Sequence, residues 1–327
     1  MIVAVLLRKL MEALLTLICA TVILFMLIRL APGDPAVLLL GQPSEVAAMH
    51  TEVYEQKAAE LREQWGLDQP MAIQYVSWLG RLVQLDLGTS LHTGRAVSAE
   101  LAERLPATLQ LTAAALAVQL LLGFWLGIVS ALKAGTFSDQ LIRLACVTLA
   151  STPAFVTGLC ALLLFAVTLG AYEISSEASW SRLWLPALTM GLASMPQFAR
   201  MVRANMLAEL GQTYVLAALS RGLARRRVIG QASRNALLPL VTVTALSAAT
   251  FASGAVVIES LFAWPGIGKY ALDSILRKDY PVIQGYAFVM VTLVILIHLC
   301  VDVLYAYIDP RLQRKRRQVT RGVNEHA

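Results

Sequence analysis

Charged side chains are scarce in this sequence: Asp, Glu, Lys and Arg make up 15% of its 327 residues, whereas soluble domains carry about 25%. Cysteine and histidine are equally sparse, with four of each and no CxxC, HxxxH or HExxH spacing. This absence argues against a disulfide framework, a zinc site and a hydrolytic metal centre. Hydrophobic residues are in excess, at 57% of the chain with a mean hydropathy of +0.65. This composition excludes a disordered chain and predicts a protein that crosses a membrane several times.

A phosphate-binding loop is also missing. The run Trp-Pro-Gly-Ile-Gly-Lys-Tyr at 264–270 is similar to one, but a Walker A motif needs a glycine where Ala263 stands and a serine or threonine where Tyr270 stands. We interpret the run as a turn between a helix and a re-entering segment. The sequence therefore predicts no nucleotide site, no metal site, no cofactor and no cluster of catalytic residues.

Six segments are apolar enough to cross a bilayer as helices, because they are rich in Leu, Ala and Val and lack the alternation of barrel strands. They cover 10–30, 107–132, 144–172, 183–199, 235–258 and 280–301. We expect the short fourth segment to continue as a helix past Arg200 and Arg203. The first could be a cleaved signal peptide, but its long apolar run without a small-residue cleavage site favours a retained anchor. The predicted fold class is an all-α membrane protein with about six transmembrane helices.

Basic residues fall mainly on one side of these spans, which orients the chain. With the N-terminus in the cytoplasm, that side holds Arg8, Lys9, Lys133, Arg221, Arg225, Arg226, Arg227, Arg234, Arg311, Arg314, Lys315, Arg316, Arg317 and Arg321. We therefore expect both termini in the cytoplasm. The same pattern accounts for the net charge of +6 without nucleic acid as a partner. The basic tail could touch anionic membrane lipid or simply be solvated.

The spans divide the chain into an N-terminal anchor helix at 1–30, an extracytoplasmic insert at 31–106, a transmembrane core at 107–308 and a basic cytoplasmic tail at 309–327. The insert mixes charged and aromatic residues and is too long for a plain connection, so we expect a small folded element. Within the core, a basic cytoplasmic loop covers about 209–237.

Several residues inside the spans are candidates for packing or for lining a pore. The glycines at 123 and 127 form a small-xxx-small pair that lets another helix approach closely. Pro153 and Pro196 can break their helices, and broken helices often line a translocation path; ordinary kinks are the alternative. His298 and Asp302 share a helical face. An ionisable pair in a membrane helix is a functional candidate, and a helix-packing hydrogen bond is the alternative.

The cytoplasmic loop contains a distinct short segment. Tyr214 opens an Ala-rich run with Ala217 and Ala218, which we expect to form a helix that ends at Gly222, a natural left-handed stop. A second helical stretch carries the basic residues, and Pro239 opens the next span. A short helix between two spans buries little surface by itself. It must therefore lie on the membrane or dock into the groove of a partner.

The pattern Ala217–Ala218–x–x–x–Gly222, followed by Leu238 and Pro239, resembles the EAA coupling loop of bacterial ATP-binding-cassette importer permeases. Throughout its length the chain is similar to the oligopeptide, dipeptide and nickel branch of these permeases. The matching runs lie, in order, at 29–35, 66–70, 86–90, 105–109, 234–236, 262–266, 279–284 and 302–306.

The chain departs from the pattern of this branch at three points. Leu216 stands at the acidic position that names the loop, the segment from Gly222 to Pro239 is slightly shorter than usual, and His298 stands where many members carry asparagine. The first two departures concern how the loop docks, and they leave the resemblance itself intact.

The resemblance implies a permease that forms half of a translocation pore in the bacterial inner membrane and catalyses no covalent step. It implies a second homologous permease subunit, two cytoplasmic ATP-binding subunits and an extracytoplasmic substrate-binding protein as partners. ATP-driven closure of the ATPases would switch the pore from inward to outward access. The residues that would couple the permease to the ATPases are Tyr214, Ala217, Ala218, Arg221, Gly222, Arg225, Arg226 and Pro239.

The substrate class stays open between short peptides and nickel or metal chelates. Peptide importers are the commonest members of the branch, whereas the runs at 203–212 and 262–270 resemble nickel or metal-chelate permeases slightly more. The alternative function is a secondary transporter or channel that is not coupled to an ATPase. The nearly charge-free centres of the spans argue against a secondary transporter.

Overall fold

The computed structural model describes residues 2–30, 55–56, 59–60, 69–175, 177–237 and 239–308. The expected tail at 309–327 and most of the insert before residue 69 lie outside the described residues. The elements are α1 (Ile2–Leu30), α4 (Met71–Val83), α5 (Val97–Leu132), α6 (Phe137–Ser151), α7 (Ala154–Leu162), the π-helix η1 (Leu163–Thr168), α8 (Trp180–Leu210), α9 (Thr213–Ser220), α10 (Arg225–Leu237), α11 (Leu240–Leu261), α12 (Ile267–Leu276) and α13 (Tyr280–Ile308). The part of the chain described here contains no strand beyond one isolated bridge, and the all-α prediction is confirmed.

Four helices are long and apolar enough to cross a membrane: α1 over Leu7–Leu27, all of α5, all of α11, and α13 over Tyr280–Cys300. A fifth crossing results if α6 and the α7–η1 pair count as one broken span. The expected fourth span lies in α8, which continues past Arg200 and Arg203 as predicted. Because α8 packs against α5, α6, α7, α10 and α11, it need not be apolar on every side. A sixth crossing, by α8, stays a prediction.

The two proline predictions have different outcomes. At Pro153 the chain breaks, since α6 ends at Ser151, α7 begins at Ala154, and the two axes differ by 99°. The break considered at Pro196 is wrong, because that residue is buried within the unbroken helix α8. Because neighbouring helices hold α8 on several sides, the helix continues although Pro196 has no N–H to donate a backbone hydrogen bond.

The closest helix pair is α5 with α8, and small residues permit the approach. A Cβ atom added at Gly123 would come within 2.8 Å of the Phe198 ring, and one added at Gly127 would come within 2.6 Å of Val202. The small-xxx-small prediction is confirmed, with α8 as the partner helix.

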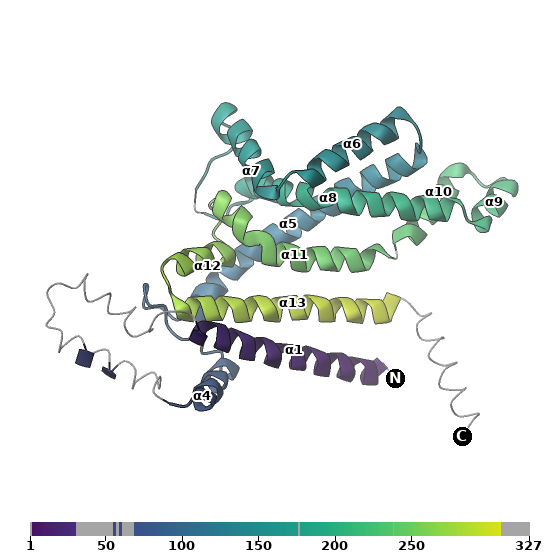
Figure 1. The fold of residues 1–327 in the computed structure, drawn as a ribbon. Coiled ribbons are helices and arrows are strands. Elements are labelled where there is room, and N and C mark those ends of the chain that lie inside the picture. The colour runs from purple at the N-terminus through teal and green to yellow at the C-terminus, as the bar shows by residue number, and fades with distance from the viewer. Residues whose placement is uncertain are drawn as a thin grey trace, which may run out of the picture.

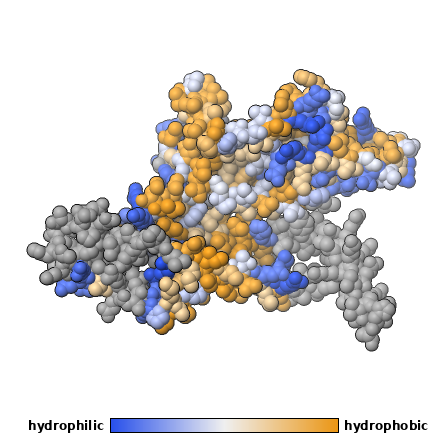
Figure 2. Space-filling view, viewed as in Figure 1, coloured by the Kyte–Doolittle hydropathy of each residue, from blue (hydrophilic) through white to orange (hydrophobic). Residues whose placement is uncertain are grey.

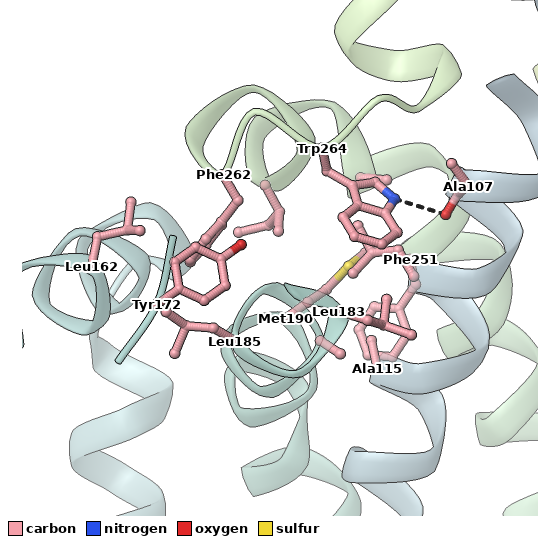
Figure 3. Close-up of a cluster of buried hydrophobic side chains, with 14 residues drawn as sticks. Ala107, Ala115, Leu162, Tyr172, Leu183, Leu185, Met190, Phe251, Phe262 and Trp264 are labelled. Atoms are coloured by element: carbon pink, nitrogen blue, oxygen red, sulfur yellow. Dashed lines mark hydrogen bonds between the residues drawn. The ribbon is translucent and has the colours of Figure 1, made fainter. Parts of the chain in front are cut away.

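The main buried cluster lies where α5, α8, α11 and the segment after η1 meet (Figure 3). The ring of Tyr172 packs edge-on against Trp184 and Phe262, with centroids 6.1 and 5.9 Å apart. The Trp264 indole N–H donates to the carbonyl of Ala107 on α5 at 2.9 Å, as Figure 3 shows. Aromatic packing thus joins the segment after η1, α8 and the end of α11 at one place.

The helical bundle has two distinct ends (Figure 1). The N-terminal end of α1, the helices α9 and α10, and the C-terminal end of α13 lie at one end, which we call the inner end. The helix α12 and the start of α5 lie at the other, outer end. This arrangement agrees with the expected topology, whose direction across the membrane stays a prediction. Helix α5 begins at Val97, so it runs through the expected boundary at 106 between insert and core.

Apolar residues cover much of the face of the bundle that is seen in Figure 2. Only 11% of the apolar window of α1 and 17% of that of α13 is buried. Cys19 on α1, Cys160 on α7 and Cys300 on α13 are exposed, whereas Cys146 is buried. An apolar surface of this extent requires lipid or another subunit to cover it.

Candidate functional site

We call residues 209–237 the coupling loop. Within this loop, helix α9 and the residues after it form the turn that we expect at Gly222. The backbone of Gly222 has φ +77°. The N–H of Leu223 donates to the carbonyl of Ala218 at 3.1 Å, and the N–H of Gly222 donates to that of Leu219 at 2.9 Å. This pair of bonds is a Schellman motif, which needs a left-handed residue at its centre. The prediction that α9 ends at Gly222 is therefore confirmed.

Three polar side chains brace this corner against the rest of the chain. The Tyr214 hydroxyl donates to the Glu209 carboxylate at 2.7 Å, and the Asn235 amide donates to the Tyr214 hydroxyl at 3.2 Å. Burial raises the pKa of the Tyr214 phenol, and the bond to Glu209 adds to the shift. The brace ties the end of α8 to both helices of the coupling loop, and Tyr214 lies at its centre.

The surface of the coupling loop combines leucines with arginines. Leu216 and Leu219 on α9 are 61% and 44% exposed, and Leu223 after the corner is 42% exposed. The candidate residues Ala217, Arg221, Gly222, Arg225, Arg226 and Pro239 are also exposed, whereas Ala218 is half-buried. Leu216, at the position where the family resemblance leads us to expect an acid, thus contributes apolar surface instead. An apolar patch with a basic border is suited to a protein groove lined by apolar and acidic residues.

Helix α10 holds the coupling loop against the inner end of the bundle. Ala232 and Ala236 are buried with Met206 of α8 and Ala131 of α5. Pro239 then forms the N-cap of α11 with φ −69°, as expected for a residue that opens a span. The loop is therefore packed onto α8 on one side and continuous with α11 on the other.

A buried ion pair joins α6 to α8, the helix that leads into this loop. The sequence alone did not predict it. Both carboxylate oxygens of Asp139 accept hydrogen bonds from Arg203, at 3.0 and 2.8 Å. The same carboxylate accepts bonds from the Ser130 hydroxyl and from the Gly135 N–H. Asp139 is 1% exposed. The pair clamps α6 and the end of α5 to α8, the helix that leads into the coupling loop.

A second polar cluster closes the outer end. The buried carboxylate of Asp279 accepts a bond from the Ser90 hydroxyl at 2.6 Å and one from the Leu91 N–H at 3.2 Å. The His92 ring is 2.9 Å from the carbonyl of Arg277. These contacts join the end of the insert to the turn between α12 and α13. Sequence reasoning missed them because the partners lie more than 180 residues apart.

The four candidate residues inside the spans lie at the bend between α6 and α7, in α8 and on α13. Pro153 is exposed at the bend between α6 and α7, whereas Pro196 is buried in α8. His298 is exposed and hydrogen-bonds the Val294 carbonyl of its own helix at 2.8 Å. The side chain of Asp302 lies outside the described residues. Within the described ranges, no group of three or more metal-ligating side chains gathers either.

Two protein families match this chain. Residues 123–314 match the family described as "Binding-protein-dependent transport system inner membrane component". Residues 2–112 match the family described as "Binding-prot-dependent transport system membrane comp, N-term". Together the two matches extend from the start of α1 to beyond the end of α13.

Several permeases of known sequence are similar over nearly their whole length. The "Di/tripeptide transport system permease protein DppB" of Pseudomonas aeruginosa is 36% identical, with 90% of this chain and 94% of the relative covered. The "Glutathione transport system permease protein GsiC" of Salmonella typhimurium is 35% identical, with 94% and 98% covered. The "Probable D,D-dipeptide transport system permease protein DdpB" of Escherichia coli is 36% identical, with 90% and 92% covered.

Proposed function

The chain belongs to the binding-protein-dependent transport system inner membrane component family, and on this premise we propose that it forms half of a pore that imports short peptides. As a member, it is a multi-pass inner-membrane permease subunit, not an enzyme, and it works with an ATPase and a substrate-binding protein. The finer proposal is a complex with one further homologous permease, two cytoplasmic ATPases and one extracytoplasmic binding protein. The uncovered apolar faces of α1 and α13 support contact with lipid and with a second permease.

The proposed substrate is a short peptide because the similar permeases named above carry peptide and glutathione names. That observation favours peptides over the nickel or metal chelates that two local runs suggested. Family membership likewise disfavours an uncoupled secondary transporter or channel. The substrate would be delivered by the binding protein. The type of binding protein that the neighbouring genes encode is therefore the most informative observation on the identity of the substrate.

The coupling loop is the proposed contact with the ATPases. Its leucine patch is exposed, its corner is braced by Tyr214, and its arginines border the patch. In a groove with acidic residues, Arg221, Arg225 and Arg226 would pair with carboxylates, and a reversed charge would repel them. On a membrane surface the same arginines would contact lipid headgroups and leave ATPase binding unchanged.

Reversing these arginines tests the proposal. We expect at least one of Arg221→Glu, Arg225→Glu and Arg226→Glu to retain about tenfold less ATPase during purification of the complex, through like-charge repulsion and an unpaired partner. Lys133→Glu is the matched control, since Lys133 is exposed at the inner end but outside the coupling loop. Full retention in all three variants would assign the arginines to the membrane surface. No ATPase bound to the wild-type chain would contradict the proposed function itself.

The proposed orientation places the inner end in the cytoplasm. It rests on the basic residues of the coupling loop and on the shared end at which α1 begins and α13 finishes. Reporter domains fused at residue 60 and at the C-terminus should report opposite sides of the membrane. Signals from the same side would overturn this topology.

A further inference from the structure

A carboxylate without a basic partner is buried at the outer end of α11. Glu259 is 0% exposed, and no ion pair found among the described residues includes it. One oxygen accepts a hydrogen bond from the Thr108 hydroxyl of α5 at 2.6 Å. The other accepts one from the backbone N–H of Lys269, in the first turn of α12, at 2.9 Å. A buried carboxyl group is costly unless it is hydrogen-bonded, and these two bonds tie Glu259 to α5 and to α12.

Glu259 and Thr108 together cap α12 from outside that helix. The N-cap residue of α12 is Gly266, which has no side chain with which to bond the free N–H groups of the first turn. The Ile267 N–H donates instead to the Thr108 hydroxyl at 2.9 Å. The positive end of the α12 dipole also stabilises the Glu259 carboxylate. Helix α12 is therefore completed by one residue of α11 and one of α5.

Two glycines lie so close to the Glu259 carboxylate that a Cβ atom on either would overlap the carboxylate or the backbone of Val256. A Cβ atom at Gly266 would lie 2.1 Å from a Glu259 oxygen. At Gly268 it would lie 2.8 Å from Val256 Cα and 2.9 Å from the other carboxylate oxygen. This is the physical reason for the glycines in the run that is similar to a phosphate loop: they admit an internal carboxylate, not a nucleotide.

Helix α11 connects Glu259 and α12 to the coupling loop. Only Leu238 and Pro239 separate α10 from the start of α11, while Glu259 lies in the last turn of α11 at the opposite end. Helix α11 therefore runs from the proposed ATPase contact to α12. Helix α12 in turn packs against α5 and α13 at the outer end. A displacement of α11 would reach α12 through the contacts that hold the two helices together.

We propose that Glu259 is a positioning residue that fixes α12 to α11, so that a displacement imposed on the coupling loop is transmitted to the outer end of the pore. The inference rests on the proposed function. Two observations carry it: the capping of α12 by Glu259 and Thr108, and the continuity of α11 with the coupling loop.

The first variant to test is Glu259→Gln in the complete complex with its ATPases and binding protein, reconstituted in vesicles. The amide keeps the volume but has a single acceptor oxygen, so it cannot accept from both the Thr108 hydroxyl and the Lys269 N–H, and the cap is weakened. We expect peptide uptake per ATP hydrolysed to fall about tenfold, with ATP hydrolysis retained. Glu103→Gln is the matched control, because Glu103 is an exposed carboxylate at the same end with its hydrogen bonds to Arg95 alone.

A second pair of variants keeps the test decisive if Glu259→Gln does not assemble. Thr108→Val removes both hydroxyl contacts and should uncouple in the same way, whereas Thr108→Ser keeps the hydroxyl and should behave like wild type. Normal uptake per ATP in Thr108→Val, or a parallel loss of uptake and hydrolysis, would overturn the proposal and leave Glu259 a purely structural residue.

Hydrogen exchange separates this inference from the proposed function. In wild type, exchange at 267–276 should change when the ATPases are trapped with ATP and vanadate. In Glu259→Gln the response should persist in α9 and disappear in α12. An undiminished α12 response would contradict the inference even if peptides are transported. If peptide uptake fails in wild type while the α12 response depends on Glu259, the error lies in the proposed substrate.

Discussion

Replacing Gly222 by valine is expected to abolish transport and to leave the chain inserted in the membrane. The residue has φ +77°, a region in which an L side chain costs about 1–2 kcal/mol, and a β-branched one more. No heavy atom lies within 4 Å of a Cβ built at this position, so the effect comes from the backbone and not from overlap. The Schellman bonds would be lost and the chain after α9 would leave in another direction. The spans do not depend on that angle, so insertion should survive.

Three non-glycine residues elsewhere in the chain also have a positive φ, and they predict how substitutions at Gly222 differ in their effect on transport. Leu85, Ala263 and Lys278 have φ of 60°, 52° and 59°, so an unbranched side chain can occupy such a corner. Gly222→Ala should therefore keep much of the transport rate that Gly222→Val loses. Gly80→Val is the matched control, since Gly80 is exposed on α4, outside the coupling loop, with open space around it. ATP-dependent peptide uptake and membrane insertion are the two measurements. Uptake by Gly222→Val at the wild-type rate would show that the corner is not the coupling element.

Breaking the Asp139–Arg203 pair is expected to cost about 3 kcal/mol of stability, because removal of one partner leaves a buried charge uncompensated. Asp139 is the more sensitive partner, with a side chain 1% exposed against 24% for Arg203. Arg203→Met should therefore lower the melting temperature of the purified chain by several degrees. Asp139→Asn should do the same, because Ser130 and Gly135 donate to different carboxylate oxygens and the amide keeps only one acceptor oxygen.

A double-mutant cycle distinguishes the pair from two independent effects. The variant with both Asp139→Asn and Arg203→Met should be more stable than the sum of the single losses indicates, since neither charge is then left alone. Removal of the exposed Arg8–Glu12 pair, whose side chains are 72% and 46% exposed, serves as the control and should cost little. Strictly additive losses at Asp139 and Arg203 would mean that the pair does not act as a clamp.

The local features of this chain could be read from the sequence because each depends on neighbouring residues. Apolar runs identified the helices α1, α5, α11 and α13, and a glycine identified the end of α9. Gly123 and Gly127 indicated a close helix contact without indicating its partner. Pro153 was a candidate for a helix break because it is a proline. The residue type alone cannot distinguish it from Pro196, where the surrounding helices keep α8 intact.

The sequence by itself therefore determined the membrane class, the positions of the long apolar helices and the turn at Gly222, all of which follow from hydropathy and local backbone preferences. Only the tertiary structure decided which distant polar groups meet. Asp139 and Arg203 are 64 residues apart, and Thr108 and Glu259 are 151 apart. Hydropathy patterns place each helix in the membrane but do not specify the rotation or the neighbours of that helix. A single carboxylate in an apolar run therefore has no visible partner until the helices pack together.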